Sequence, residues 1–284
     1  MSDQTPDDLK MKSQQKAAWN DTAEGWKRWW PTFERAAQIV NDRLVELAGV
    51  RAGSRVLDIA TGSGEPALTA ARAVGQSGRV VAVDMSPEML AIARERIDAA
   101  GLRNVELVES DAEALKLDAN SFDAALCRWG LMFMPDLDGL VRGLHRALKP
   151  DGRFATAVWS VADKVPMCGL ARDAIRRITG IVPPPNAPDP TRLADPSILE
   201  RALAGAGFRD VTIERLIVTF EFPSPDAFAD FRGQIGGTRA TLAKMPADVA
   251  RQVRDAVVTA AREYATPGGV VRLSNETICF AAHA

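Results

Sequence analysis

The 284-residue sequence is poor in the side chains that most metal and disulfide chemistry requires. It holds two histidines, three cysteines and one tyrosine. The cysteines, Cys127, Cys168 and Cys279, are odd in number and show no C-x-x-C spacing, so we expect neither a disulfide framework nor a structural zinc site. We therefore predict no metal cofactor, and the sparse cysteines favour a reducing, cytoplasmic location.

Long apolar segments and a surplus of positive charge are also missing. No run approaches the ~18 apolar residues that a membrane-spanning helix needs, and the polar residues 1–16 lack the apolar stretch of a secretory signal. The formal charge is −2, and the 35 basic residues form no run of five or more. We expect neither a membrane span nor a nucleic-acid partner.

What the sequence does contain is a regular alternation of short apolar runs and helical patterns. Such an order predicts right-handed β-α-β units, and hence an α/β fold with a doubly wound, mostly parallel sheet covered on both faces. Ser86 and Pro87 provide the N-cap and first position of one of the intervening helices. The five apolar runs are residues 56–60, 79–85, 104–111, 122–127 and 153–159.

The two ends of the chain follow other patterns. Residues 1–50 have helical apolar spacing, whereas the proline-rich residues 181–190 predict a loop. Two late apolar runs, 210–222 and 270–282, predict an antiparallel hairpin at the sheet edge, with helices between them. We therefore divide the chain into an N-terminal helical cap (1–50), a core (51–222 and 269–284) and a helical lid insertion (223–268).

A glycine-rich turn joins the first predicted strand to its helix in VLDIATGSGEPA, residues 56–67. Gly62 and Gly64 allow a close approach of the backbone to a ligand. The segment fits one form of the dinucleotide-binding fingerprint, but that pattern also occurs in turns that hold no ligand. The turn alone therefore does not identify a site.

Three aspartates near the ends of successive strands make the site more specific. The carboxyl ends of the strands line the ligand crevice of a doubly wound sheet, where Asp84 could accept from a ribose diol and Asp111 from an adenine amino group. Asp58, just before the turn, opposes a pyrophosphate and suits an ammonium group. S-adenosylmethionine carries an ammonium, a ribose and adenine but no phosphate, so the three acids favour it. Each acid alone would equally suit a helix cap or the surface.

With these features the sequence resembles the class I S-adenosylmethionine-dependent methyltransferases. VLDIATGSGEPA is similar to their first motif, VVAVDMS to the second, ESDAEALKLDANSFDAALC to the third and fourth, and RALKPDGRF to the following turn. The resemblance is strongest to the ubiquinone/menaquinone-biosynthesis C-methyltransferase type. It implies a Rossmann-like, seven-stranded sheet and in-line transfer of a methyl group to a small, partly apolar molecule.

The resemblance also implies which residues hold the cofactor. Ala60 stands where many members have a glycine, but its role would be through the backbone. Trp19 and Trp26 resemble aromatic residues that cap the cofactor, and would equally serve only to bury the N-terminal helix. The full cofactor set is Trp19, Trp26, Asp58, Ala60, Thr61, Gly62, Ser63, Gly64, Asp84, Met85, Asp111, Ala112, Cys127 and Arg128.

No residue stands out as a general base. Arg128, Trp129 and Tyr264 are the catalytic candidates, although Arg128 equally suits an ion pair with a structural acid. Two other functions stay open: a nicotinamide-dependent oxidoreductase, which shares the glycine turn and Asp84, and a non-catalytic, cofactor-binding partner subunit. The sequence does not decide between a monomer and a homodimer, nor does it identify the methyl acceptor.

Overall fold

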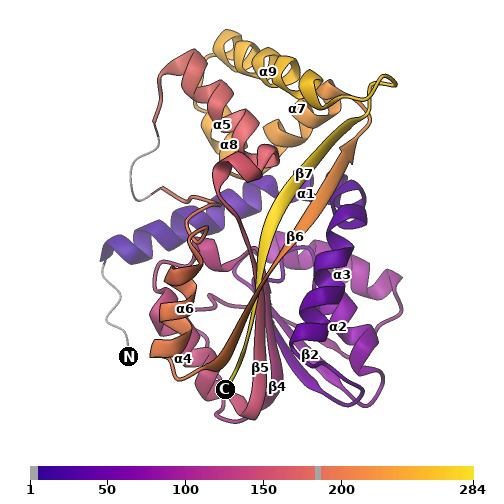
Figure 1. Cartoon of the computed structure of the whole chain (residues 1–284), viewed down its shortest axis with the longest axis vertical. Helices are drawn as coiled ribbons and strands as arrows, with labels where there is room; N and C mark the ends of the chain where they lie inside the picture. Colours follow the sequence, from indigo (N-terminus) through magenta and orange to yellow (C-terminus); the bar gives the residue numbers. More distant parts are fainter. Residues whose placement is uncertain (1–5, 183–186) are drawn as a thin grey trace.

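A seven-stranded sheet forms the centre of the protein, whose computed structural model describes residues 6–182 and 187–284 (Figure 1). The strand order is β3-β2-β1-β4-β5-β7-β6. The first five strands pair in parallel, and β7 pairs antiparallel with both β5 and β6, which confirms the predicted sheet with its antiparallel edge hairpin. The strands are β1 (Arg55–Ile59), β2 (Arg79–Asp84), β3 (Val105–Glu109), β4 (Phe122–Arg128), β5 (Leu148–Trp159), β6 (Arg209–Phe222) and β7 (Val271–His283).

Helices cover both faces of the sheet, with α2 and α3 on one side and α4 and α6 on the other (Figure 1). Several begin at residues whose side chains cap them: Ser86 and Ser224 each accept a hydrogen bond from a backbone N–H in the first turn. The helices are α1 (Pro6–Leu47), α2 (Ala67–Val74), α3 (Pro87–Ala99), α4 (Leu137–Ala147), α5 (Pro166–Thr179), α6 (Pro196–Gly205), α7 (Pro225–Gln234), α8 (Gly236–Leu242) and α9 (Ala247–Ala261), with 3₁₀ turns η1 (Leu131–Phe133), η2 (Ala162–Lys164) and η3 (Arg262–Tyr264).

The central strands β1 and β4 are buried almost throughout, because helices cover both of their faces. Their sequences are accordingly continuous apolar runs rather than alternating ones. The predicted KPDG turn before β5 is instead part of that strand, where the pairing with β4 shifts register and Asp151 adopts a positive φ of 64°.

The N-terminal cap is one 42-residue helix, α1. Its first part, indigo in Figure 1, lies between the sheet and the helices above it. Helix α1 as a whole contacts α3, α7 and α8 as well as β4, β5 and β6. Within the described residues, no helix is long and apolar enough to cross a membrane.

The lid contains more of the chain than the sequence predicts. Helices α7, α8 and α9 come from the expected segment 223–268, but α5 packs against α9 although it belongs to the segment assigned to the core (Figure 1). The described residues of 181–190 form the expected loop, and residues 183–186 lie outside the described part. The predicted boundary at residue 223 stays a prediction.

Candidate functional site

The glycine turn follows β1 and has three residues with left-handed backbone angles. Ala60, Gly62 and Gly64 have φ of 54°, 55° and 102°. A Cβ atom on Gly64 would lie 2.5 Å from Cδ1 of Leu68 and 3.3 Å from Cβ of Ala93. Because α2 and α3 approach so closely here, position 64 accepts only glycine.

A second strained residue lies beside the glycine turn. Trp129, the first residue after β4, has a φ of 54°, like Ala60 after the adjacent β1. The two strand ends are also tightly packed, since a Cβ atom on Gly130 would be 2.6 Å from Cβ of Ala60. Strained backbone in adjacent strand ends is costly and is concentrated at functional sites, so this edge of the sheet is the candidate site.

Asp84 ends β2 and fastens the glycine turn to the start of α3. Its Oδ2 accepts from the Gly62 N–H at 2.8 Å and its Oδ1 from the Ser86 N–H at 2.9 Å. Burial raises the pKa of Asp84, and these N–H donors oppose the rise. Each carboxylate oxygen can accept more than one hydrogen bond, so Asp84 retains capacity for a ligand. Met85 beside it is half-buried.

Asp58 is fully buried at the foot of the turn, and one of its oxygens lacks a partner. Oδ2 accepts from the Ala67 N–H at 3.0 Å, which fixes the start of α2. Oδ1 and the Thr61 Oγ1 have no hydrogen-bond partner of good geometry within the part of the chain that the structure describes. Burial raises the pKa of Asp58 to about 7, and the nearby Thr61 hydroxyl opposes the rise. Because buried polar atoms are nearly always paired, these two oxygens fit a ligand that donates hydrogen bonds.

Asp111 pairs with Lys12, a residue that no sequence motif singles out. Lys12, on the first turns of α1, places its Nζ 2.6 Å from Oδ2 of Asp111 and 2.6 Å from Oε2 of Glu113. Burial alone would lower the pKa of Lys12, but the two carboxylates outweigh it and raise that pKa. Ala112, between the two acids, is half-buried. The first part of α1 thus covers the end of β3.

The two tryptophans expected to cap the cofactor both lie on this part of α1. The Trp19 ring packs edge-on against Phe133 of η1 at a centroid distance of 5.4 Å. Trp26 contacts Phe33 and, in the lid, Phe231 at 5.1 and 6.3 Å. Both therefore help to pack α1, and their contact with a cofactor stays a prediction.

Arg128, expected to face the methyl group or orient a substrate, is instead part of a buried ion pair. Its guanidinium donates to both carboxylate oxygens of Glu34, at 2.8 and 2.6 Å, and to Oδ1 of Asn41 at 2.7 Å. Both charged side chains are 8% exposed. The pairing with a structural acid, one of the two expected uses of Arg128, is therefore observed, and its contact with a cofactor or substrate stays a prediction.

A second buried pair supports the glycine turn from the side of α3. Arg96 donates to the Ser63 carbonyl at 2.6 Å and to Glu65 at 3.2 Å, and its guanidinium lies 4.3 Å from the Trp30 ring centroid. Sequence reasoning missed Glu34, Glu65 and Arg96, because isolated charges on helices and turns carry no motif. Their carboxylates and guanidiniums meet only in the folded chain.

Cys127 lies at the edge of the sheet where the turn lies, whereas Tyr264 does not reach it. A Cβ atom on Gly130 would be 2.9 Å from Sγ of Cys127. The thiol is fully buried, burial raises its pKa to about 12, and its contact with a cofactor stays a prediction. Tyr264 lies in η3, exposed, next to Ala265, which pairs with Val271. Thr277, which bonds to Trp129 at the sheet edge, is six residues along β7 from Val271, or about 20 Å at ~3.3 Å per residue. Tyr264 is therefore far from that edge.

Trp129 forms an aromatic wall at the carboxyl ends of β4 and β5. Its ring stacks on that of Trp159 at 4.2 Å and packs edge-on against Phe33 at 5.5 Å. Its Nε1 donates to Oγ1 of Thr277 at 2.9 Å. Its place beside Ala60 makes it the catalytic candidate that the structure positions at this edge.

Comparisons with known proteins agree with this architecture. A family model described as a methyltransferase domain matches residues 56–152. The ubiquinone/menaquinone biosynthesis C-methyltransferase UbiE of Pseudomonas putida is 42% identical over 117 residues, 41% of this chain and 46% of that protein. The chain spans about half the length of most of the curated relatives it matches.

Two further matches extend over more of the chain. The UbiE protein of Azotobacter vinelandii is 34% identical over 184 residues, which cover 61% of this chain and 72% of that protein. The structure of Haemonchus contortus phosphoethanolamine N-methyltransferase 2 in complex with S-adenosyl-L-methionine has a TM-score of 0.56 over 89% of this chain and 56% of that chain; at 22% identity it shows the fold alone. The extent of the Azotobacter match establishes that this chain belongs to the UbiE-like family of class I S-adenosylmethionine-dependent methyltransferases.

Proposed function

We propose that this protein transfers a methyl group from S-adenosylmethionine to a small, partly apolar molecule. One observation carries the proposal beyond family membership: Oδ1 of Asp58 and Oγ1 of Thr61 are buried at the glycine turn without a hydrogen-bond partner among the described residues. A buried carboxylate oxygen beside a threonine hydroxyl fits the ammonium of an amino acid, and the carboxylate opposes a phosphate. The same atoms argue against the nicotinamide-dependent alternative, whose cofactor brings a pyrophosphate to this turn.

Several residues would hold the cofactor. Asp84 and Met85 would bind its ribose and adenine, the backbone of residues 60–64 its amino-acid part, and Asp58 and Thr61 its ammonium. The cofactor, when bound, supplies a methyl group on a positively charged sulfur. The chain's own contribution is position: the paired Arg128 and Arg96 fix the strand ends and the turn, and α1 excludes water from above.

The acceptor's character follows from the wall beside the turn. Trp129 is half-buried and packs on the buried rings of Trp159 and Phe33, and its indole N–H is already bonded to Thr277, so what it can present to an acceptor is mainly apolar. We therefore propose a small acceptor with an apolar part rather than a nucleic acid. Free Cys127 and Cys279, both buried, suit a reducing cytoplasm. Light scattering of the purified protein would distinguish a monomer from a homodimer.

Calorimetric titration tests the cofactor. S-adenosylhomocysteine should bind and NADH should not. Asp84→Asn, which keeps one carbonyl oxygen but loses the charge, should weaken that binding at least about tenfold. Asp138→Asn is the matched control, because Asp138 is exposed in the first turn of α4. Saturable binding of NADH, or an unchanged affinity of the Asp84 variant, would refute the cofactor assignment.

A separate experiment tests catalysis. The protein is incubated with a metabolite extract and S-adenosylmethionine that carries a deuterated methyl group, and mass spectrometry searches for labelled products. A labelled small molecule supports the proposal. Binding of S-adenosylhomocysteine without any labelled product would favour the non-catalytic partner subunit.

A further inference from the structure

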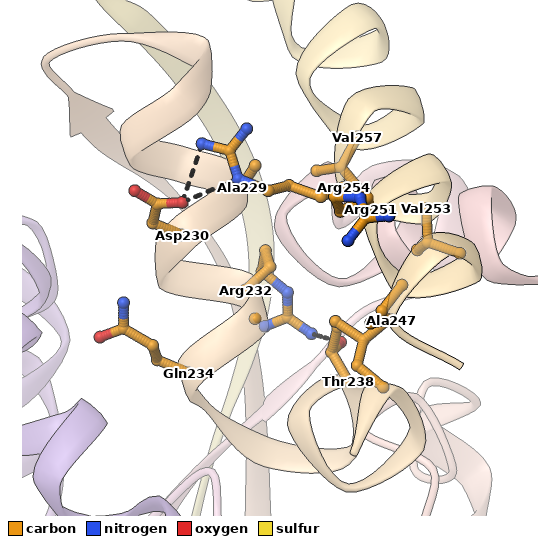
Figure 2. A pocket seen from close by; sticks show the side chains of 13 residues that line it. Ala229, Asp230, Arg232, Gln234, Thr238, Ala247, Arg251, Val253, Arg254 and Val257 are labelled. Carbon is orange, nitrogen blue, oxygen red and sulfur yellow. Dashed lines mark hydrogen bonds and ion pairs between the residues drawn. The ribbon is translucent and has the colours of Figure 1, made fainter. Parts of the chain in front are cut away.

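The lid has an open cavity of about 440 Å³ between α7, α8 and α9 (Figure 2), and no residue of the glycine turn lines it. That volume is within the range of small-molecule sites, ~300–1,000 Å³. Its walls are largely apolar, with Leu242, Val253 and Val257 among them, but three arginines and one aspartate also line it. The cavity thus combines an apolar body with an excess of positive charge.

Arg232 is the unusual member of this lining. Its Nη2 donates to Oγ1 of Thr238 at 3.0 Å, while its Nε is buried without a hydrogen-bond partner among the described residues (Figure 2). No acidic side chain of the described chain forms an ion pair with it. Arg232 is half-buried as a whole, and a charge partly removed from water without a counter-charge is costly, so its position favours an anionic ligand.

The nearby acids do not neutralise Arg232. Asp230, the aspartate of the lining, accepts from Arg254 at 3.0 Å, as does Asp226 (Figure 2). Cys168 is the nearest other ionisable group, and burial raises the pKa of its thiol, so it stays neutral. Burial lowers the pKa of Arg232 itself from its ordinary value. The charge on Arg232 therefore has no internal balance.

The cavity is distinct from the candidate site at the sheet edge. Phe231 packs on Trp26 and Trp29 of α1 on one side of α7. Arg232, the next residue, is turned by about 100° around the helix and faces α8 and α9 instead. No residue of the glycine turn lines the cavity, although Gln234 of its lining accepts from Nε1 of Trp29 in α1 at 3.1 Å.

We propose that the lid cavity binds a small amphipathic anion, whose carboxylate or phosphate pairs with Arg232 and whose apolar part lies against Leu242, Val253 and Val257. Arg251, exposed at the rim, adds a second positive charge. The proposal does not depend on the methyl-transfer function, because no residue of the glycine turn takes part in it.

Four probes with matched parts test the assignment by calorimetry: octanoate, octyl phosphate, 1-octanol and inorganic phosphate. Octanoate or octyl phosphate should bind, and the better of the two identifies the head group. Equal binding of 1-octanol would overturn the anionic half of the assignment, and equal binding of inorganic phosphate the apolar half. Saturation with S-adenosylhomocysteine should leave octanoate or octyl phosphate binding unchanged, whereas competition would overturn the claim of a separate site.

Arg232→Met separates a binding role from a structural one. Methionine keeps an apolar stem, so the free variant should melt no lower than the wild type, since an unbalanced buried charge is gone. Its affinity for the anionic probe should fall at least about tenfold. Arg177→Met, at an exposed residue of α5 outside the lining, is the control and should match the wild type. A lower melting temperature together with unchanged probe affinity would show that Arg232 serves only to support the lid.

Discussion

The buried pair of Glu34 and Arg128 offers the sharpest test of how α1 is held on the sheet. We predict that Glu34→Gln destabilises the protein far more than the loss of a surface pair does. Burial alone would raise the pKa of Glu34, but the adjacent Arg128 outweighs it and holds that pKa below its ordinary value. The variant leaves Arg128, 8% exposed, bonded to Asn41 but without a paired carboxylate, since its other acidic neighbours, Glu65 and Asp58, make no ion pair with it.

The magnitude follows from that burial. Breaking a buried ion pair by removing one partner costs about 3–5 kcal/mol. At about 2–4 °C per kcal/mol for a protein of this size, the melting temperature should fall by about 6–20 °C. Lys27→Met, which removes the exposed pair with Glu95, should cost less than about 1 kcal/mol.

Urea unfolding followed by tryptophan fluorescence measures both variants. A third variant, Glu34→Leu with Arg128→Met, replaces the pair by apolar side chains and should recover most of the lost stability. The reasoning fails if Glu34→Gln costs no more than Lys27→Met, or if the double variant is as unstable as the sum of its single changes.

Three further predictions concern the sheet edge. Burial raises the pKa of Asp58 from 3.8 to about 7, so the folded chain retains a proton that the unfolded chain has lost. Stability is therefore lost as the pH rises from about 4 to 7, and Asp58→Asn should become more stable than the wild type across that range in urea unfolding. The absence of such a gain would count against the raised pKa. Ala60→Gly should stabilise the protein by about 1 kcal/mol, because glycine adopts a positive φ without strain. Gly130→Ala should cost about 1–3 kcal/mol alone and less in the Ala60→Gly background, where the Cβ of residue 60 is gone. Strictly additive effects in thermal unfolding would contradict this. Lys12→Met should release Asp111 and tighten S-adenosylhomocysteine binding about fivefold by calorimetry, or ~1 kcal/mol; weaker binding would place Lys12 in the cofactor site.

The sheet and the starts of several helices could be predicted because their causes are local. Apolar runs of strand length and the caps at Ser86 and Ser224 need only neighbouring residues to be recognised. Helix α5 was missed because a proline-rich segment follows it and no cap marks its start. Its place in the lid depends on contact with α9, which lies about eighty residues further along the chain.

The candidate site divides in the same way. The turn and Asp84 were predictable because glycine and a strand-end acid carry a spacing that the chemistry requires. The role of Arg128 was not, since its partner Glu34 is 94 residues away and either use of an arginine gives the same sequence. Lys12 likewise meets Asp111 only because α1 folds back over the sheet.

The two parts of α1 are held by forces of different strength. Its C-terminal part is fixed by Glu34 and by fully buried apolar residues of the main core, Ala37, Val40 and Leu44. Much of its N-terminal part is held by ion pairs that are largely exposed, such as those of Lys16 and Asp21, each of which is worth at most about 1 kcal/mol.

This contrast predicts that α1 opens from its N-terminus while the rest stays closed. Residues 12–26 should exchange their amide hydrogens faster than residues 33–47, as measured by mass spectrometry, because local opening follows the weakest contacts. Pro31, inside the helix, removes one helical hydrogen bond near the boundary between the two parts. S-adenosylhomocysteine should slow exchange in residues 12–26, since the cofactor would lie beneath them. Uniform exchange along α1 would mean that the helix opens as one unit, and the crevice would then have to be reached from the lid side.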